Sequence, residues 1–179
     1  MKLLRSINTA VVLLLLSSPA YPQLTIDMAA IKCDQYLAMT PVMSRDFSAW
    51  MSGWFSQRFG HVSVGMNDFA RNIAAVKQWC GLNPQRTVMA ALEQSPPQPG
   101  PPGGQVTIDM SLITCKQYLA GDTKAQEMIA NWMGGYFRAS KSQPVFDFKR
   151  SAGNRKAVSA YCRKNGAETL MSAIQKRAR

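Results

Sequence analysis

The sequence predicts an all-α protein built from two tandem four-helix modules, each stapled by one disulfide. Three observations predict this fold. The chain repeats itself once without a gap at an offset of 82 residues, each copy holds one cysteine pair at the same separation, and apolar residues recur at helical intervals in both copies. We place the first module at residues 25–93 and the second at residues 107–179.

The repeat is carried by short motifs. Thr-Ile-Asp-Met at residues 25–28 recurs at 107–110, and Gln-Tyr-Leu-Ala at 35–38 recurs at 117–120. Each copy has about 70 residues, a size at which one hydrophobic core is marginal without a covalent staple. Whatever the module does, we expect the chain to do it twice.

The first two helices of a module follow from capping residues and apolar spacing. Asp27 is the expected N-cap of the first helix, which ends before Thr40 and Pro41. Ser44 is the expected N-cap of the second. In the second helix the bulky apolar residues are three and four positions apart, which is typical of an amphipathic helix. They are Phe47, Trp50, Met51, Trp54 and Phe55 in the first copy and Ile129, Trp132, Met133, Tyr136 and Phe137 in the second.

Two further helices complete the module. Residues 60–65 predict a connection with short extended character, after which Asn67 or Asp68 caps a third helix that carries the second cysteine. Asn83 followed by Pro84 predicts the start of the last helix, because Asn is favoured at the N-cap and Pro at the first helical position.

The first 20 residues are typical of a secretory signal peptide. Lys2 and Arg5 supply the positive end, residues 10–16 the apolar stretch and residues 18–20 a small-residue cleavage site. The apolar stretch is shorter than the roughly 20 residues that a membrane-spanning helix needs. We therefore expect residues 1–20 to be removed and the mature protein to work outside the cytoplasm.

Four cysteines in two symmetric pairs favour structural disulfides in such a compartment. Because duplication makes each module self-contained, we expect Cys33 to bond Cys80 and Cys115 to bond Cys162. A disulfide that closes a loop as long as the segment between the two cysteines of a pair stabilises a domain by about 4 kcal/mol in the chain-entropy account. Four free thiols are the alternative.

Residues 94–106 join the modules. They are rich in proline and glycine, cannot form a helix interior and have nothing to bury, so we interpret them as a linker. Polyproline II spacing lets such a segment reach about 30 to 40 Å. The modules can therefore dock on each other or stand apart.

The net charge of +11 is unevenly distributed. Residues 25–93 carry six Lys or Arg against five acids, whereas residues 107–179 carry thirteen against five. The second copy therefore has a basic surface, which either only keeps the protein soluble or attracts anionic envelope components or acidic proteins. We expect no nucleic-acid partner.

Residue patterns for catalysis or metal binding are missing from the sequence. The single histidine, His61, has Gln143 as its counterpart, and there is no His-Glu-x-x-His, Cys-x-x-Cys or Gly-x-Ser-x-Gly motif. The glycines of residues 100–104 lie among prolines rather than between a strand and a helix, so they form no phosphate loop. We expect neither an enzyme, nor a cofactor, nor a metal site.

The aromatic and methionine stripe of the second helix has two interpretations. It is either ordinary core or, because a module this small cannot enclose so many bulky groups, partly an exposed surface that binds another protein. Gly53 and Gly135 lie in mid-helix, where glycine costs about 1 kcal/mol against alanine. They indicate close backbone approach to another helix or module.

Three motifs in a fixed order are repeated in both copies. They are Cys-Asp-Gln-Tyr-Leu at 33–37, Trp-Met-Ser-Gly-Trp at 50–54 and Trp-Cys-Gly-Leu-Asn-Pro at 79–84, with counterparts at 115–119, 132–136 and 161–165. In this arrangement the chain resembles the HdeA/HdeB family of periplasmic acid-stress chaperones. The resemblance covers both copies and omits only the signal and the linker.

The resemblance implies a small helical protein that is dimeric at neutral pH. On acidification it would expose apolar surface and hold unfolding periplasmic proteins without ATP. For this chain it implies that the two modules pair within one molecule. The expected client or module interface consists of Trp50, Met51, Trp54, Phe55, Trp132, Met133, Tyr136 and Phe137. A periplasmic envelope-binding or adaptor protein that uses the basic second copy is the competing hypothesis.

Overall fold

The structure is a computed structural model that describes residues 25–95 and 106–177. The predicted signal peptide (1–20) and most of the predicted linker (94–106) lie outside the described residues. In the first copy the elements are β1 (Thr25–Asp27), α1 (Cys33–Leu37), α2 (Pro41–Arg58), β2 (Ser63–Gly65), α3 (Met66–Leu82) and α4 (Val88–Gln94). In the second they are β3 (Thr107–Asp109), α5 (Cys115–Ala120), α6 (Thr123–Ala139), β4 (Val145–Asp147), α7 (Phe148–Cys162) and α8 (Leu170–Arg177).

The predicted all-α fold and the predicted disulfides are confirmed. Each copy contributes four helices, and the strands are three residues long. Cys33 is bonded to Cys80, which ties α1 to α3, and Cys115 is bonded to Cys162, which ties α5 to α7. None of the helices in the described ranges is long and apolar enough to cross a membrane.

The predicted start of the first helix is wrong. Asp27 ends strand β1, and α1 begins only at Cys33 after a turn in which Ile31 N donates to Asp27 O (2.8 Å). Asp27 therefore serves the turn instead of a helix: its carboxylate accepts a hydrogen bond from Ala29 N (2.9 Å). A capping residue cannot be told from a turn residue by type, because Asp satisfies free N–H groups in both.

Helix α2, in contrast, begins earlier than predicted. Thr40 is its N-cap, since Met43 N donates to Thr40 Oγ1 (3.4 Å), and Pro41 is its first residue. Proline suits this position because it lacks an N–H that would have no partner there. Ser44, the predicted cap, lies inside the helix and is buried.

The last helix of the first copy begins later than predicted. Asn83 closes α3 instead, and its Nδ2 donates to Trp79 O (2.9 Å). Pro84 O accepts from Asp34 N (3.0 Å) and Asn83 O accepts from Arg86 N (3.0 Å), so the segment after α3 is a turn that is bonded to the start of α1. Helix α4 then starts at Val88 with Thr87 as its cap.

The third helix starts close to the prediction. Helix α3 begins at Met66, just before the predicted caps Asn67 and Asp68, with Gly65 as its N-cap. In the second copy Asp147 is the N-cap of α7, and its Oδ1 accepts from Arg150 N (2.8 Å). The predicted extended connection is strand β2.

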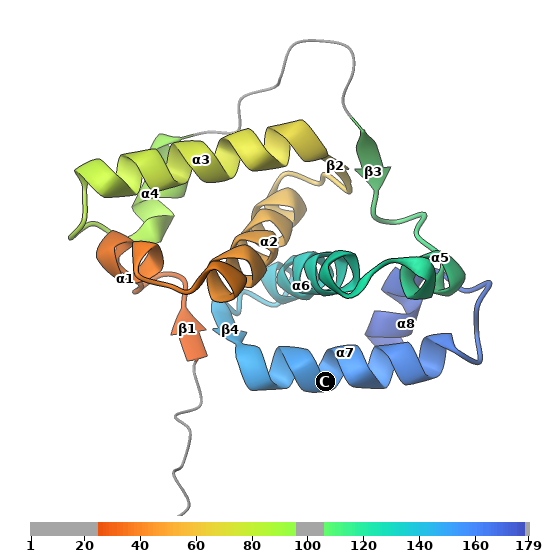
Figure 1. The fold of residues 1–179 in the computed structure, drawn as a ribbon. Helices are drawn as coiled ribbons and strands as arrows, with labels where there is room; N and C mark the ends of the chain where they lie inside the picture. The colour runs from red at the N-terminus through yellow and green to blue at the C-terminus, as the bar shows by residue number, and fades with distance from the viewer. Residues whose placement is uncertain (1–24, 96–105, 178–179) are drawn as a thin grey trace, which may run out of the picture.

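Each strand pairs with a strand of the other copy. β1 runs antiparallel to β4 with Ile26 opposite Phe146, and β2 runs antiparallel to β3 with Val64 opposite Ile108. The repeat offset converts one register into the other, so the copies are related by a pseudo-two-fold axis. The strand pairs lie at opposite corners of the molecule (Figure 1).

Helices α2 and α6 pack against each other at the centre, while α3 and α7 lie on opposite sides of them (Figure 1). Two hydrophobic cores result, and each receives residues from the other copy. Phe146 and Phe148 of the second copy pack into the first core, and Val64 and Phe69 of the first copy pack into the second. A module of this size thus gains core volume from its partner.

Candidate functional site

The predicted interface residues lie along the centre of the molecule. Trp50, Met51, Trp132 and Met133 are at most 3% exposed, and Trp54 is 6% exposed. The remaining members are half-buried, namely Phe55, Tyr136 and Phe137. In this structure the stripe is therefore mostly buried where α2 and α6 meet.

The stripe has the same geometry in both copies. The rings of Trp50 and Trp54 stack with centroids 5.4 Å apart, and the rings of Trp132 and Tyr136 stack at 5.3 Å. Polar groups are buried here as well. Among the described residues, the indole N–H groups of Trp54 and Trp132 are buried and find no hydrogen-bond partner. Each such group costs free energy in the closed state.

Gly53 and Gly135 make the crossing of α2 and α6 possible. A Cβ added at Gly53 would lie 1.8 Å from Trp132 O, and one added at Gly135 would lie 1.9 Å from Trp50 O. No side chain fits into these spaces, so the two helix backbones are in direct contact. The mid-helix glycines indicated this approach in the sequence.

Charged side chains connect the modules next to the crossing. Arg45 Nη2 of α2 donates to Glu127 Oε2 of α6 (2.5 Å) and to Asp46 Oδ1 (2.7 Å). Glu127 Oε1 accepts from Arg155 Nη2 of α7 (3.2 Å). Desolvation acts to lower the pKa of Arg45, but its hydrogen bonds and the charges of Asp46 and Glu127 outweigh it, so the pKa is raised. Sequence reasoning missed this cluster, since its members are far apart in the chain.

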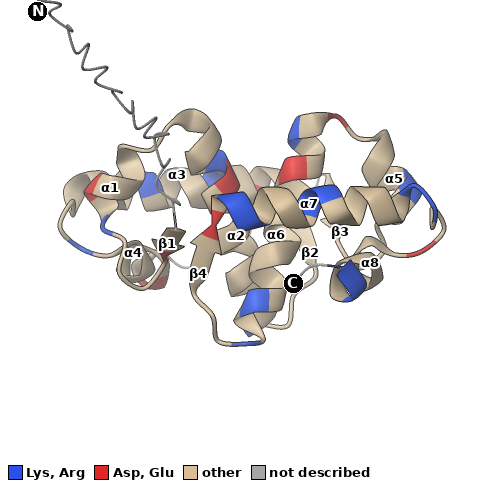
Figure 2. Ribbon diagram, turned by 90° about the horizontal axis from the view of Figure 1, so that it is seen from below, with Lys and Arg blue, Asp and Glu red and all other residues tan. Residues whose placement is uncertain are grey.

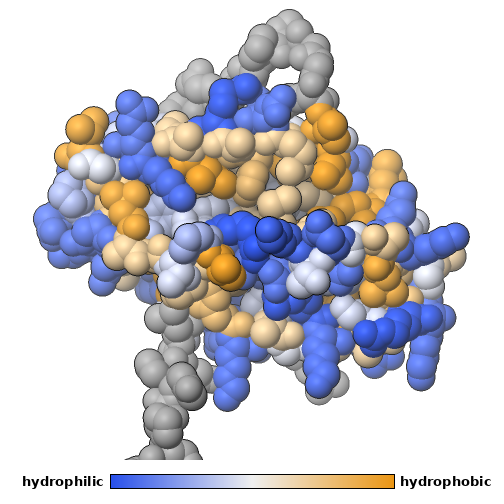
Figure 3. Space-filling model, viewed as in Figure 1, coloured by the Kyte–Doolittle hydropathy of each residue, from blue (hydrophilic) through white to orange (hydrophobic). Residues whose placement is uncertain are grey.

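A groove that sequence reasoning also missed lies in the first copy. It has a volume of about 330 Å³ and runs between α2, α3 and β2. Ser48, Ser52 and Ser56 line it from α2, and the rest of the lining is aromatic and aliphatic with a few polar residues, among them Asp68 and Asn72. The serines recur every four residues, a spacing that marks one face of a helix and was the available signal. Hydrophobic residues gather on the surface where α3 lies over α2 (Figure 3).

The equivalent groove of the second copy is nearly closed. Its volume is about 50 Å³, and Gly134, Arg138 and Arg155 stand where the first copy has Ser52, Ser56 and Ile73. Burial, and then the charge of Arg150, lower the pKa of Arg138. The two copies therefore have the same backbone fold but different grooves. The groove of the first copy is mostly apolar and open, whereas that of the second copy is basic and narrow.

Lys and Arg residues of the second copy lie on helix α7 and also near α5 and α8 (Figure 2). Hydrophilic side chains also dominate the edge of the molecule that α7 forms in Figure 3. Lys149, Lys156 and Lys164 are exposed there.

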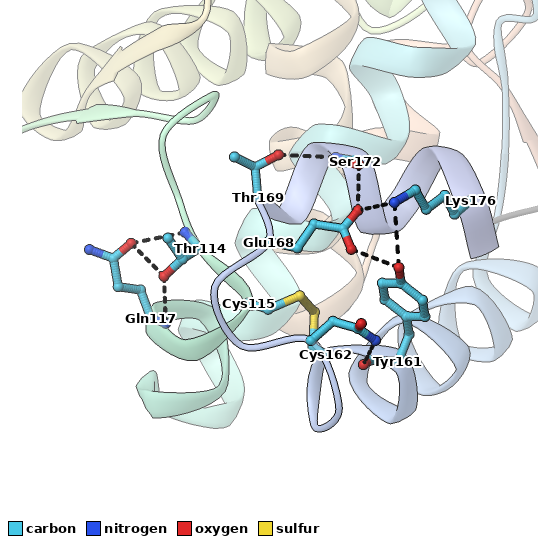
Figure 4. The surroundings of a disulfide bond; sticks show 10 residues. Thr114, Cys115, Gln117, Tyr161, Cys162, Glu168, Thr169, Ser172 and Lys176 are labelled. Atoms are coloured by element: carbon cyan, nitrogen blue, oxygen red, sulfur yellow. Dashed lines mark hydrogen bonds and ion pairs between the residues drawn. A yellow bond between two sulfur atoms is a disulfide. The ribbon is translucent and has the colours of Figure 1, made fainter.

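A hydrogen-bonded cluster surrounds the end of the second copy near its disulfide (Figure 4). Glu168 accepts from Lys176 Nζ (2.5 Å), from Ser172 Oγ and from Tyr161 OH (2.6 Å). These donors, Lys176 first, lower the pKa of Glu168 to about 2. The first copy has Arg86 at this position, so the cluster belongs to the second copy alone.

Within residues 25–95 and 106–177, no group of three or more His, Cys, Asp or Glu side chains could hold a metal ion. His61 lies at the exposed rim of the first groove, where its ring stacks on Phe59.

The fold is that of a duplicated, disulfide-stapled helical module whose two copies are in contact in this structure. The family model of the HdeA/HdeB family matches the chain twice, over residues 6–90 and 90–172. The chain belongs to this family, which is known for periplasmic acid-stress chaperones. No curated protein and no solved structure gives a significant match.

Proposed function

We propose that the chain is a periplasmic, ATP-independent holdase that protects unfolding proteins under acid stress. The observation that carries the proposal is the burial of the aromatic stripe between α2 and α6, because separating the modules would turn this core into a binding surface. Apolar surface is what an unfolding client offers at low pH, where its carboxylates are neutral.

Acid weakens the closed form through charge. Asp and Glu titrate near pH 4, so acidification removes the negative partners of Arg45 and Arg155 and leaves both copies more positive. Repulsion between two cationic modules opposes their pairing. The disulfides keep each module from expanding fully.

We also propose that the two modules of one chain are each other's partner in solution. Two interdigitating strand pairs, a glycine-mediated helix crossing and shared cores support this proposal. The signal peptide predicted at residues 1–20 would deliver the chain to the periplasm.

A client-aggregation assay from pH 2 to 7, with binding of an apolar dye measured in parallel, tests the holdase. We expect protection and dye binding to rise together as the pH falls below 4. Dye binding without protection at any pH would contradict the proposal.

The basic surface of α7 supports a second candidate, an adaptor that binds an anionic envelope component such as lipopolysaccharide or peptidoglycan. Salt separates the two functions. Binding through exposed cations weakens steeply as salt rises, whereas holding of clients through apolar contacts does not.

A further inference from the structure

Arg45 and Glu127 occupy the same position of the repeat, since they are separated by the repeat offset. They are also in contact with each other, with Arg45 Nη2 lying 2.5 Å from Glu127 Oε2. One position of the module therefore faces its own counterpart across the module pair. The two copies carry opposite charges there.

This contact spans the pseudo-two-fold axis. The offset that exchanges the two strand registers also exchanges the Gly53–Trp132 and Gly135–Trp50 contacts. A contact between equivalent positions is its own image under that exchange. A pair of two first modules built on the same interface would hence set Arg45 against another Arg45, and a pair of two second modules would set Glu127 against another Glu127.

The neighbouring charges continue the alternation. Asp46 flanks Arg45 and has the neutral Met128 as its counterpart, whereas Arg155 flanks Glu127 and has the neutral Ile73. The row Asp46, Arg45, Glu127, Arg155 alternates in sign only when a first module meets a second. These side chains are 11% to 25% exposed, so solvent screens them less than it screens surface ions.

We propose that this row of charges is a pairing code, which makes the first module fit the second module and reject another copy of itself. The α2 face of the first module then has one preferred partner, a second module. Because both kinds of module lie in one chain, the code favours closure within the molecule over assembly between like modules of different chains. The code requires that the two modules pair, as proposed above, but it does not require holdase activity.

Charge reversal in the full-length chain tests the code. Arg45→Glu places two glutamates at the axis, and Glu127→Arg places two arginines there. We expect each single change to lower the thermal unfolding midpoint by about 3 °C or more at neutral pH and low salt. The double variant restores an opposite pair, so it should unfold at a higher temperature than either single variant, although its flanking charges no longer alternate.

Mixing the two single variants is the sharper test. The first module of Arg45→Glu matches the second module of Glu127→Arg, and the reverse combination is the native pair. After brief incubation at pH 3 and return to pH 7, native mass spectrometry should find more mixed dimers than random association of the two variants would give. Arg86→Glu and Glu93→Arg, both at exposed positions of the first copy, serve as controls and should show no such preference.

The pairing code is overturned if the double variant is no more stable than the weaker single variant, or if mixed dimers show no excess. Should a reversed variant fail to fold by circular dichroism, the neutral pair Arg45→Gln and Glu127→Gln replaces it. A double-mutant cycle on these must then show coupling between the two positions. Purely additive losses would likewise overturn the proposal.

Discussion

At the scale of single residues, two glycines decide how closely the copies meet. The space beside Gly53 and Gly135 is occupied by backbone carbonyl groups of the opposite helix, which cannot rotate away as a side chain would. Such a contact is intolerant of even one methyl group.

We therefore predict that Gly53→Ala or Gly135→Ala destabilises the chain by about 2 to 3 kcal/mol, because the helices must move apart and loosen both cores. Urea unfolding at neutral pH measures the loss. Gly153→Ala is the matched control, since its surroundings are open and alanine favours the interior of α7. If the control loses as much stability as the interface changes, the close contact is not the cause.

Glu168 makes the stability of the second copy depend on pH. Its pKa in the folded state, about 2, is below its ordinary value of 4.5 because Lys176, Ser172 and Tyr161 donate to the carboxylate. A lowered pKa stabilises the folded state above the unfolded value, and this contribution is lost as the pH falls from about 4.5 through about 2.

Glu168→Gln should accordingly flatten the decline of stability between pH 4.5 and pH 2 relative to the parent chain. Urea midpoints measured at half-unit intervals across this range test it. Glu93→Gln, a change of an exposed carboxyl on α4, provides the comparison. An unchanged slope in Glu168→Gln would remove Glu168 from the acid response.

At the scale of elements, strands β1 to β4 show how each copy completes the other. Phe146 of β4 is 2% exposed and packs 5.7 Å from the ring of Trp50 and 6.1 Å from that of Phe47, both in the first copy. Phe146 of the second copy is thus part of the hydrophobic core of the first copy.

Phe146→Ala should cost about 3 to 5 kcal/mol of stability and alter the near-ultraviolet circular dichroism of the tryptophans of the first copy. Phe59→Ala is the matched control, because Phe59 is 62% exposed, and it should change stability by at most about 0.5 kcal/mol. Equal losses of stability in the two variants would mean that the pairing of β1 with β4 does not contribute to the core of the first copy.

The sequence predicted the elements more reliably than their ends. Local spacing was enough for α2 and α6, because an apolar stripe and mid-helix glycines act within one helix. The starts of α1 and α4 depend on distant backbone bonds, such as Cys33 N to Arg86 O and Val88 N to Ile31 O. Likewise, neither the strand exchange nor the contact between Arg45 and Glu127 could be predicted, since both exist only once two copies meet.

At the scale of the whole molecule, duplication allowed two halves of one interface to diverge. The first copy keeps a small net charge and an open apolar groove, whereas the second is strongly basic and its groove is nearly closed by arginines. A symmetric dimer of identical chains could not separate these properties. The apolar and the basic surfaces can therefore be tested independently.

If the chain is a holdase, protection should depend on the aromatic stripe more than on the basic residues. Trp54 is too deeply buried for a clean test, because changing it would also destabilise the core. Phe55 and Phe137, which are equivalent and half-buried, are better positions. Phe55→Ser with Phe137→Ser should reduce protection of an aggregating client at pH 3 several-fold.

The reversals Lys156→Glu and Lys164→Glu should mainly alter solubility, since both side chains are exposed and clients at this pH carry few ionised carboxylates to pair with them. Circular dichroism at pH 7 must first show that each variant is folded. Loss of protection in the charge reversals, with the aromatic variant unaffected, would favour the adaptor over the holdase.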